Sequence, residues 1–244
     1  MKLVNFSKPN IEGIDLQFWG SNIEGSNGKY ISDRGEPDII LQNIQAFKKA
    51  SGCKKLAFMN QKHTNIIKQV DSNNYTDGDY LCDGQVTKEK GIALIVQTAD
   101  CVPILFYDDD RAIIGAAHAG WRGAIGGVIE NTISTMKKQG AHKINAFIGP
   151  CIKPESYEVD LGFYEQFCKE SPNNAKFFTV PEDRAHKFLF DLPSYVKNSL
   201  TKAAIEIIAD CEINTYSDEQ LFSFRRYTHF GGDYGSNISM ISLK

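Results

Sequence analysis

Residues Gln97–Gly123 read QTADCVPILFYDDDRAIIGAAHAGWRG, and this stretch decides the fold. Two apolar runs flank the polar tetrapeptide Asp108–Arg111, a pattern typical of a β-hairpin. With the turn centred in the middle of this tetrapeptide, Cys101 faces His118 across the hairpin. Directly opposed residues point to the same face with Cβ atoms about 4.5–5.5 Å apart, whereas a slip of one residue would separate them. Alone, each would be interpreted as a core residue, but the pair predicts two ligands of one metal ion.

His63 supplies the third candidate ligand, because it lies in a polar loop between two predicted strands, and such loops often carry function. A solvated surface histidine is the alternative interpretation. One thiolate and two imidazoles suit Zn²⁺, and three protein ligands leave a fourth position for water or substrate. We therefore predict a catalytic zinc site in which Cys101 is a ligand rather than a free nucleophile. The remaining histidines, His142, His186 and His229, lie in polar settings typical of the surface.

The residues around these ligands indicate an anion site. Gly120 and Gly123 permit a close approach beside a predicted helix start, and Arg122 could grip a phosphate group. A tight turn with a surface arginine is the alternative. Asp100 adjoins Cys101 and is a candidate to orient a ligand or to carry a proton, unless it is a simple turn residue.

The composition excludes several classes of protein. The chain has 244 residues, a formal net charge of −3 and a pI of about 6.0, without the basic patch of a nucleic-acid-binding protein. Its start lacks the apolar core of a signal peptide, and its apolar runs are too short to span a bilayer. Six scattered cysteines without a Cys-x-x-Cys pair are typical of free thiols. We expect a cytoplasmic protein that binds neither membrane nor nucleic acid.

Helical and extended patterns alternate along one domain, 1–244, without repeats or linkers. This predicts an α/β (α+β) layered sandwich. Strands are expected at 55–60, 66–70, 92–98, 103–107, 111–117 and 144–148, and extended segments at 3–19, 222–225 and 238–242. Residues 21–36 are expected to form a mobile loop. A helix beginning at Pro37 and ending before Gly52 would place Ile40, Leu41, Ile44 and Phe47 on one face; further helices are expected at 123–139, 161–170 and from the Asp191 cap to 204.

The sequence resembles the zinc-dependent purine nucleoside phosphorylases, a family long named multicopper polyphenol oxidases or laccase-domain proteins, which includes a peptidoglycan editing factor. The stretches that carry this resemblance are Gln61–His63, Asp83–Thr87, Thr98–Pro103, His118–Gly123, Ile148–Ile152, Ser156–Val159 and Phe222–Arg226. The resemblance implies zinc on His63, Cys101 and His118 and substrate contacts from Gln61, Arg122 and Arg225. It also implies an α/β/β/α sandwich akin to cysteine hydrolase toxins.

The activity implied by the resemblance is phosphorolysis of adenosine, inosine and guanosine, with methylthioadenosine as a further candidate and adenosine deamination as a second activity. Purine nucleosides and phosphate would be the partners of a monomer or homodimer. One departure is that family members follow the double arginine with Thr-Gly-Arg, whereas no arginine follows Arg226 here. Contacts at that end of the substrate are therefore open.

Three other functions compete with this one. A multicopper oxidase needs many imidazole ligands, and five scattered histidines are too few. A cysteine hydrolase would use Cys101 as nucleophile and His118 as base, without zinc. A zinc-stabilised binding protein or peptidoglycan-precursor editing factor would unfold on chelation.

Overall fold

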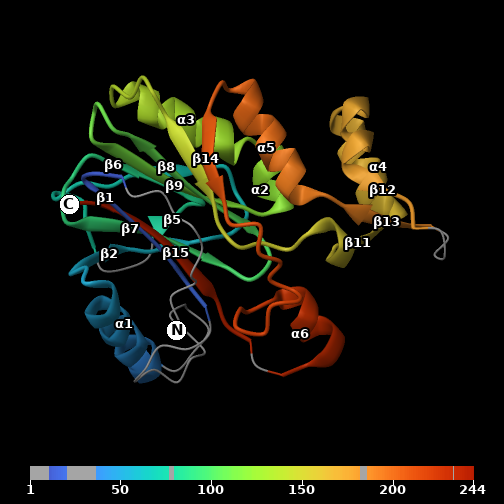
Figure 1. Cartoon of the computed structure of the whole chain (residues 1–244), viewed down its shortest axis with the longest axis horizontal. Helices are drawn as coiled ribbons and strands as arrows, with labels where there is room; N and C mark the ends of the chain where they lie inside the picture. Colours follow the sequence, from blue (N-terminus) through green and yellow to red (C-terminus); the bar gives the residue numbers. More distant parts are fainter. Residues whose placement is uncertain (1–10, 21–36, 77–79, 182–185, 233) are drawn as a thin grey trace.

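Two β-sheets stacked face to face form the centre of the molecule (Figure 1), a computed structural model that describes residues 11–20, 37–76, 80–181, 186–232 and 234–244. The larger sheet has six strands in the order β14 (Glu206–Asp210), β10 (Asn145–Ile148), β8 (Val102–Asp108), β9 (Ile113–Ala119), β6 (Gly84–Thr87) and β4 (Ile67–Gln69). The smaller has four strands in the order β1 (Ile14–Trp19), β15 (Asn237–Leu243), β7 (Ile92–Thr98) and β2 (Lys55–Ala57).

The continuous apolar runs of β7 and β8 arise because both faces of each sheet are covered. Side chains alternate across a strand, so Leu94 of β7 and Leu105 of β8 enter the core between the sheets. Their neighbours point the other way: Ile95 packs in the outer core of the smaller sheet, and Phe106 in that of the larger sheet. All four side chains are fully buried.

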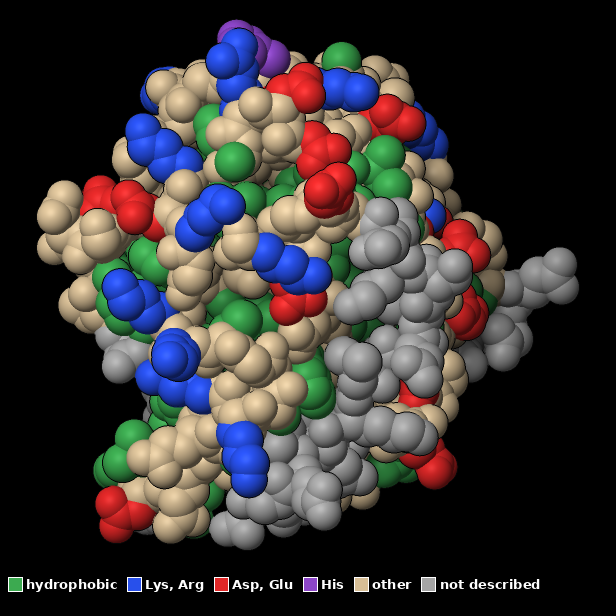
Figure 2. Space-filling model, turned by 60° about the vertical axis from the view of Figure 1, so that its left-hand side comes forward, with side chains coloured by type: hydrophobic (Ala, Val, Ile, Leu, Met, Phe, Trp, Pro, Cys, Tyr) green, Lys and Arg blue, Asp and Glu red, His purple; other side chains and the backbone are tan. Residues whose placement is uncertain are grey.

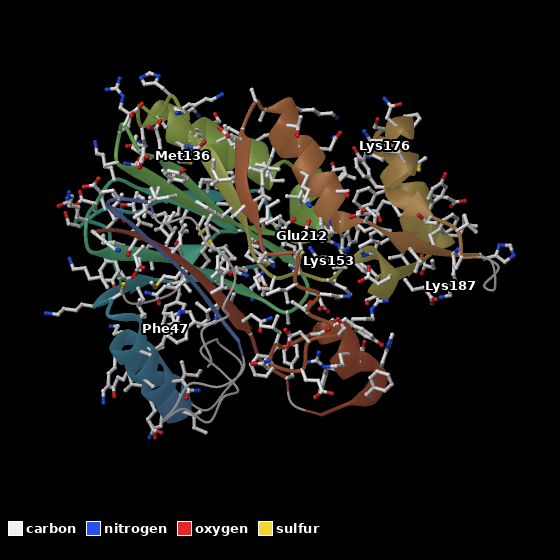
Figure 3. All side chains as sticks on the ribbon, in the orientation of Figure 1. Phe47, Met136, Lys153, Lys176, Lys187 and Glu212 are labelled. Carbon is white, nitrogen blue, oxygen red and sulfur yellow. The ribbon has the colours of Figure 1, made fainter. Side chains whose placement is uncertain are left out.

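Helices cover both outer faces, which completes four layers. On the smaller sheet lies α1 (Pro37–Ser51), anchored by the buried Phe47. On the larger sheet lie α2 (Trp121–Ile125), α3 (Val128–Lys138) and α5 (Leu192–Lys202), with Met136 of α3 in the core. Figure 1 shows α1 below the sheets and α3 and α5 above them, and Figure 3 labels Phe47 and Met136 in the two helical layers. The predicted α/β/β/α sandwich is confirmed.

A small aromatic module adjoins the sandwich at one end (Figure 1). It contains the three-stranded sheet β11 (Glu158–Asp160), β13 (Lys187–Phe190) and β12 (Phe178–Thr179), the helix α4 (Leu161–Glu170), and 3₁₀ turns at Pro154–Ser156 and Pro172–Phe177. Phe163 of α4 packs on Trp121 of α2 at 4.7 Å between ring centroids, which joins the module to the larger sheet's helices. The remaining elements are the pair β3 (Met59–Asn60) and β5 (Tyr80–Leu81), and α6 (Phe224–Phe230).

Several predicted boundaries are corrected. The helix expected at 123–139 is two helices, because Gly127 has a left-handed φ of 92° between α2 and α3. The segment 222–225, expected to be extended, enters α6, whose first turn is capped by the Ser223 side chain. In α1, Leu41 is 56% exposed, and the buried face carries Asn43 and Ser51 with Phe47. The loop expected at 21–36 and the start of the 3–19 segment lie outside the described residues.

The hairpin register is also corrected. Strand β8 pairs with β9 so that Pro103, rather than Cys101, faces His118, a difference of two residues. The turn is longer than predicted because Ala112 adopts a left-handed φ of 48° and the first pair is Asp108 with Ile113. Since side chains alternate with a period of two, this error leaves Cys101 and His118 on the same face.

The surface carries charges of both signs. On the face in Figure 2, lysine and arginine side chains are interleaved with aspartate and glutamate. In the described part of the chain, every helix is too short or too polar to cross a bilayer.

Candidate metal centre

Three segments bring the predicted ligands together. His63 comes from the loop between β3 and β4, Cys101 directly precedes β8, and His118 lies within β9. Their ligand atoms all lie within 4.8 Å of one another, and the Cys101 Sγ is 3.6 Å from the His63 Nε2. Tetrahedral zinc, with bonds of 2.0–2.3 Å, places its ligand atoms roughly 3.5 Å apart. The three residues could therefore hold one metal ion.

Asp83, which the sequence analysis did not single out, is hydrogen-bonded to two of the three candidate ligands, His63 and His118. Its carboxylate is fully buried and lies 2.8 Å from the His118 Nδ1. The same carboxylate accepts the backbone N–H groups of Lys62, His63 and Thr64 at 3.1, 2.9 and 2.7 Å, and the Thr64 hydroxyl at 2.7 Å. One side chain thus shapes the loop that carries His63 and fixes the orientation of His118. With Nδ1 engaged, the His118 Nε2 is the nitrogen that remains for a metal.

Gly120 has no side chain, and this absence leaves room for the side chains of His63 and Cys101. A Cβ atom at this position would lie 2.3 Å from the His63 Cδ2 and 3.0 Å from the Cys101 Sγ. Only glycine allows the strand end to approach the ligands this closely. The donor set and this cradle together fit a metal ion such as zinc.

Electrostatics inside the cluster favour a charged thiolate. Burial raises the pKa of Cys101, but His118 and His63 outweigh burial and lower it to about 6. Burial likewise lowers the pKa of His118, yet the Cys101 thiolate and Asp83 raise it to about 9. The metal-free site therefore holds a thiolate–imidazolium pair, and a metal ion must displace the proton from His118 to bind. For Asp83, burial raises the pKa, and hydrogen bonds from His118 and Thr64 lower it to about 2.

Two residues at the site have left-handed backbones. His63 has a φ of 60° and Asp100, which precedes Cys101, has a φ of 94°. Such conformations cost of order 1–3 kcal/mol and persist where surrounding contacts fix them. The Asp100 backbone is fixed by its own carboxylate, which accepts the Thr215 hydroxyl and the Arg225 N–H, both at 2.7 Å.

The two consecutive arginines, Arg225 and Arg226, have different roles. Arg226 donates its guanidinium to four backbone carbonyl groups, those of Thr215, Tyr216, Asp218 and Leu221, so it fixes the loop before α6. Arg225 instead donates to the Glu158 carbonyl at 2.6 Å and lies 5.2 Å from the centre of the Tyr157 ring. Arg225 thus connects Asp100, the residue before Cys101, to the segment that contains Tyr157.

Gln61 and Arg122 have different partners near the cluster. The Gln61 amide pairs with the backbone of Gln97 in both directions, at 2.6 and 2.9 Å, and so ties the ligand loop to the end of β7. Arg122 is exposed and stacks on Trp121, with its guanidinium carbon 4.2 Å from the ring centroid.

Tyr157 is a second residue that the sequence analysis quoted without a role. Burial raises the pKa of its hydroxyl, and the neighbouring Cys101 raises it further while Arg225 and Arg122 act in the opposite direction. The hydroxyl therefore stays protonated and lies within electrostatic reach of both arginines and a metal ligand.

Comparison with known proteins assigns the chain to a family. The profile of a family described as multi-copper polyphenol oxidoreductase laccase matches residues 24–244. The chain belongs to this family. It is 36% identical to a purine nucleoside phosphorylase of Rickettsia prowazekii over 96% of this chain and 98% of that protein. A purine nucleoside phosphorylase of Rickettsia conorii is 35% identical over 84% and 85%. The crystal structure of a Neisseria meningitidis protein matches with a TM-score of 0.83 and 26% identity, covering 100% of this chain and 98% of that one.

The copper in the family description is not matched by the ligands of this member. Within the described residues, His63, Cys101 and His118 form one group of histidine, cysteine or acidic side chains able to hold a metal ion, and no second group is found. A laccase-type oxidation would need several copper ions held mainly by imidazole. The part of this chain that the structure describes instead offers one candidate centre, with one sulfur and two nitrogen donors.

Proposed function

We propose that this protein is a zinc-dependent purine nucleoside phosphorylase acting on adenosine, inosine and guanosine, with methylthioadenosine as a further candidate substrate. The observation that carries the proposal is the cluster of His63, Cys101 and His118, backed by Asp83 and bordered by two arginines. The names of the two Rickettsia relatives support the same assignment.

Zinc is the metal that this donor set favours, because it accepts thiolate and imidazole in a tetrahedron with three protein ligands at catalytic sites. When bound, zinc would supply a Lewis acid to the site. His63, Cys101 and His118 would hold it, and Asp83 would keep the His118 Nδ1 protonated and its Nε2 available.

Arg122 and Arg225 would hold the phosphate. Neither forms an ion pair with any carboxylate among the described residues, so both guanidinium groups can take an anionic ligand. In phosphorolysis a phosphate oxygen bonds to the anomeric carbon, the bond from that carbon to the purine nitrogen breaks, and the base leaves with the electron pair and takes up a proton. The transition state resembles an oxocarbenium ion, so the arginines act by positioning the attacking anion.

Adenosine deamination is a second activity that we propose for the same centre. Asp100 was the candidate proton carrier, but both of its oxygens already accept hydrogen bonds, from Thr215 and Arg225. We therefore assign Asp100 a positioning role, in which it orders the backbone before Cys101 and the start of α6.

A cysteine hydrolase is the second candidate, and one observation favours it. Cys101, His118 and Asp83 follow one another in the order nucleophile, base and orienting acid, and the thiol has a lowered pKa. His63, 3.6 Å from the same sulfur, is not needed for such a triad but is needed for a metal site.

The deciding experiment is phosphate-dependent release of hypoxanthine from inosine, with adenosine conversion followed in parallel. Turnover should collapse in Cys101→Ala and His118→Ala while circular dichroism shows the fold intact. Cys168→Ala and His142→Ala, which change the same residue types away from the cluster, should retain full turnover. Removal of the metal should abolish activity and added zinc should restore it. Undiminished turnover after complete demetallation would refute the proposal, and thiol-dependent hydrolysis without metal would establish the hydrolase.

A further inference from the structure

We propose that the Tyr157 hydroxyl is a phosphate-binding group that completes an anion site with Arg122 and Arg225. This inference rests on the proposed phosphorolysis and names a residue for its second substrate.

Phe163 holds the two halves of this site in fixed relation. The Tyr157 ring packs on Phe163 at 6.3 Å and the Trp121 ring packs on it at 4.7 Å. Each of these rings carries a guanidinium group, since Arg225 lies 5.2 Å from the Tyr157 centroid and Arg122 lies 4.2 Å from the Trp121 centroid. The two arginines thus lie on an aromatic support made of Tyr157, Phe163 and Trp121.

The support is fixed to the metal ligands. Arg225 donates its backbone N–H to Asp100, the residue before Cys101, and its guanidinium to the carbonyl of Glu158, the residue after Tyr157. Trp121 and Arg122 begin α2 three and four residues after His118. Arg122 is therefore tied to His118 through the chain, and Arg225 and Tyr157 are tied to the neighbour of Cys101 through hydrogen bonds.

The Tyr157 hydroxyl has no competing role in the described structure. It makes no hydrogen bond to any described residue, although the ring is half-buried and held on two sides by Phe163 and Phe190. A tyrosine hydroxyl is protonated at neutral pH and can donate one hydrogen bond. Beside two guanidinium groups that have no carboxylate partner among the described residues, the ligand class that would use this donor is an oxyanion of phosphate type.

The Glu158 side chain does not cancel the charge of the site. Its carboxylate lies 3.6 Å from the ammonium group of Lys187, and only its backbone carbonyl reaches Arg225. The negative groups that act on Tyr157 are Cys101 and Asp100, and the positive groups that oppose them are Arg225 and Arg122. An anion beside Tyr157 would therefore be held by the two arginines, and a metal ion bound to Cys101 would offset the charge of the thiolate.

The test compares Tyr157→Phe with Tyr164→Phe in the zinc-loaded protein. Tyr164 belongs to the same aromatic module, where its ring stacks on Phe188 at 4.4 Å and its hydroxyl is hydrogen-bonded to Cys168. The readouts are KM for phosphate at saturating inosine, KM for inosine at saturating phosphate, zinc content, and direct binding of inorganic phosphate by calorimetry.

Loss of a hydrogen bond to a charged group corresponds to about 10- to 100-fold in affinity. We expect Tyr157→Phe to raise the phosphate KM and Kd by this factor, with the inosine KM and zinc content unchanged and Tyr164→Phe like the wild type. Unchanged phosphate binding in Tyr157→Phe would overturn the inference, as would a rise confined to the inosine KM. A wild-type protein that binds phosphate without any turnover would instead refute the proposed function, so the two failures are distinguishable.

Discussion

Asp83→Asn tests the metal centre most sharply, because one atom changes in a carboxylate that serves two ligands. Oδ2 of Asp83 accepts the Lys62 and Thr64 N–H groups and the Thr64 hydroxyl, and Oδ1 accepts the His63 N–H and faces the His118 Nδ1. An asparagine retains only one side-chain oxygen. Its amide nitrogen, which cannot accept a hydrogen bond, must therefore lie next to one of these two sets of donors.

Both orientations of the asparagine are unfavourable. With the nitrogen toward Thr64, two part-buried backbone N–H groups lose their acceptor, and each costs up to about 1–3 kcal/mol. With the nitrogen toward His118, the imidazole must present a lone pair at Nδ1, which moves its proton to Nε2 and blocks the metal-binding nitrogen. We expect a loss of roughly 2–4 kcal/mol in unfolding free energy and a 10- to 100-fold loss of zinc affinity.

Asp108→Asn is the matched control. Asp108 is also fully buried and also accepts backbone N–H groups, from Arg111, His142 and Lys143, but it lies at the end of β8 that is away from Cys101. Urea denaturation of the metal-free proteins and chelator competition for zinc separate the two effects. Both variants should lose stability, and only Asp83→Asn should lose zinc affinity. Wild-type zinc affinity in Asp83→Asn, or an equal loss in Asp108→Asn, would refute the reasoning.

Two further predictions concern the cradle and the thiol. Gly120→Ala should lower zinc affinity more than tenfold by displacing His63, whereas Gly162→Ala in the open surface of α4 should leave it unchanged in the same chelator assay. In metal-free protein, iodoacetamide labelling of Cys101 should rise with pH through about 6 and level off near 7, because its thiolate forms above the lowered pKa; bound zinc should protect it. Mass spectrometry of the peptides should show Cys151 unlabelled there, since burial raises its pKa to about 12, and Cys101 labelling that begins only above pH 8 would contradict the predicted thiolate.

The elements predicted best from sequence are those whose pattern of apolar and polar residues fits only one type of secondary structure. Strand β7 and helix α4 have the predicted bounds, because a short apolar run between polar residues and an amphipathic run behind Asp160 leave few alternatives. The segment 222–225 was predicted wrongly because its aromatic residues favour a strand locally. The Ser223 cap and the contact of Arg225 with Asp100, more than a hundred residues away, favour the helix instead.

The cluster of three candidate ligands was within reach of sequence reasoning, whereas the residues that orient them were not. Cys101 and His118 share a strand pair, so the period of two places them on one face even though the register was two residues off. Asp83 gives no such signal, since a single acidic residue before a strand is usually a turn residue. It acts only once β6 lies beside β9 and the 62–64 loop folds over its carboxylate. Orienting residues depend on tertiary contacts of this kind, so a site inferred from ligands alone remains incomplete until the fold is known.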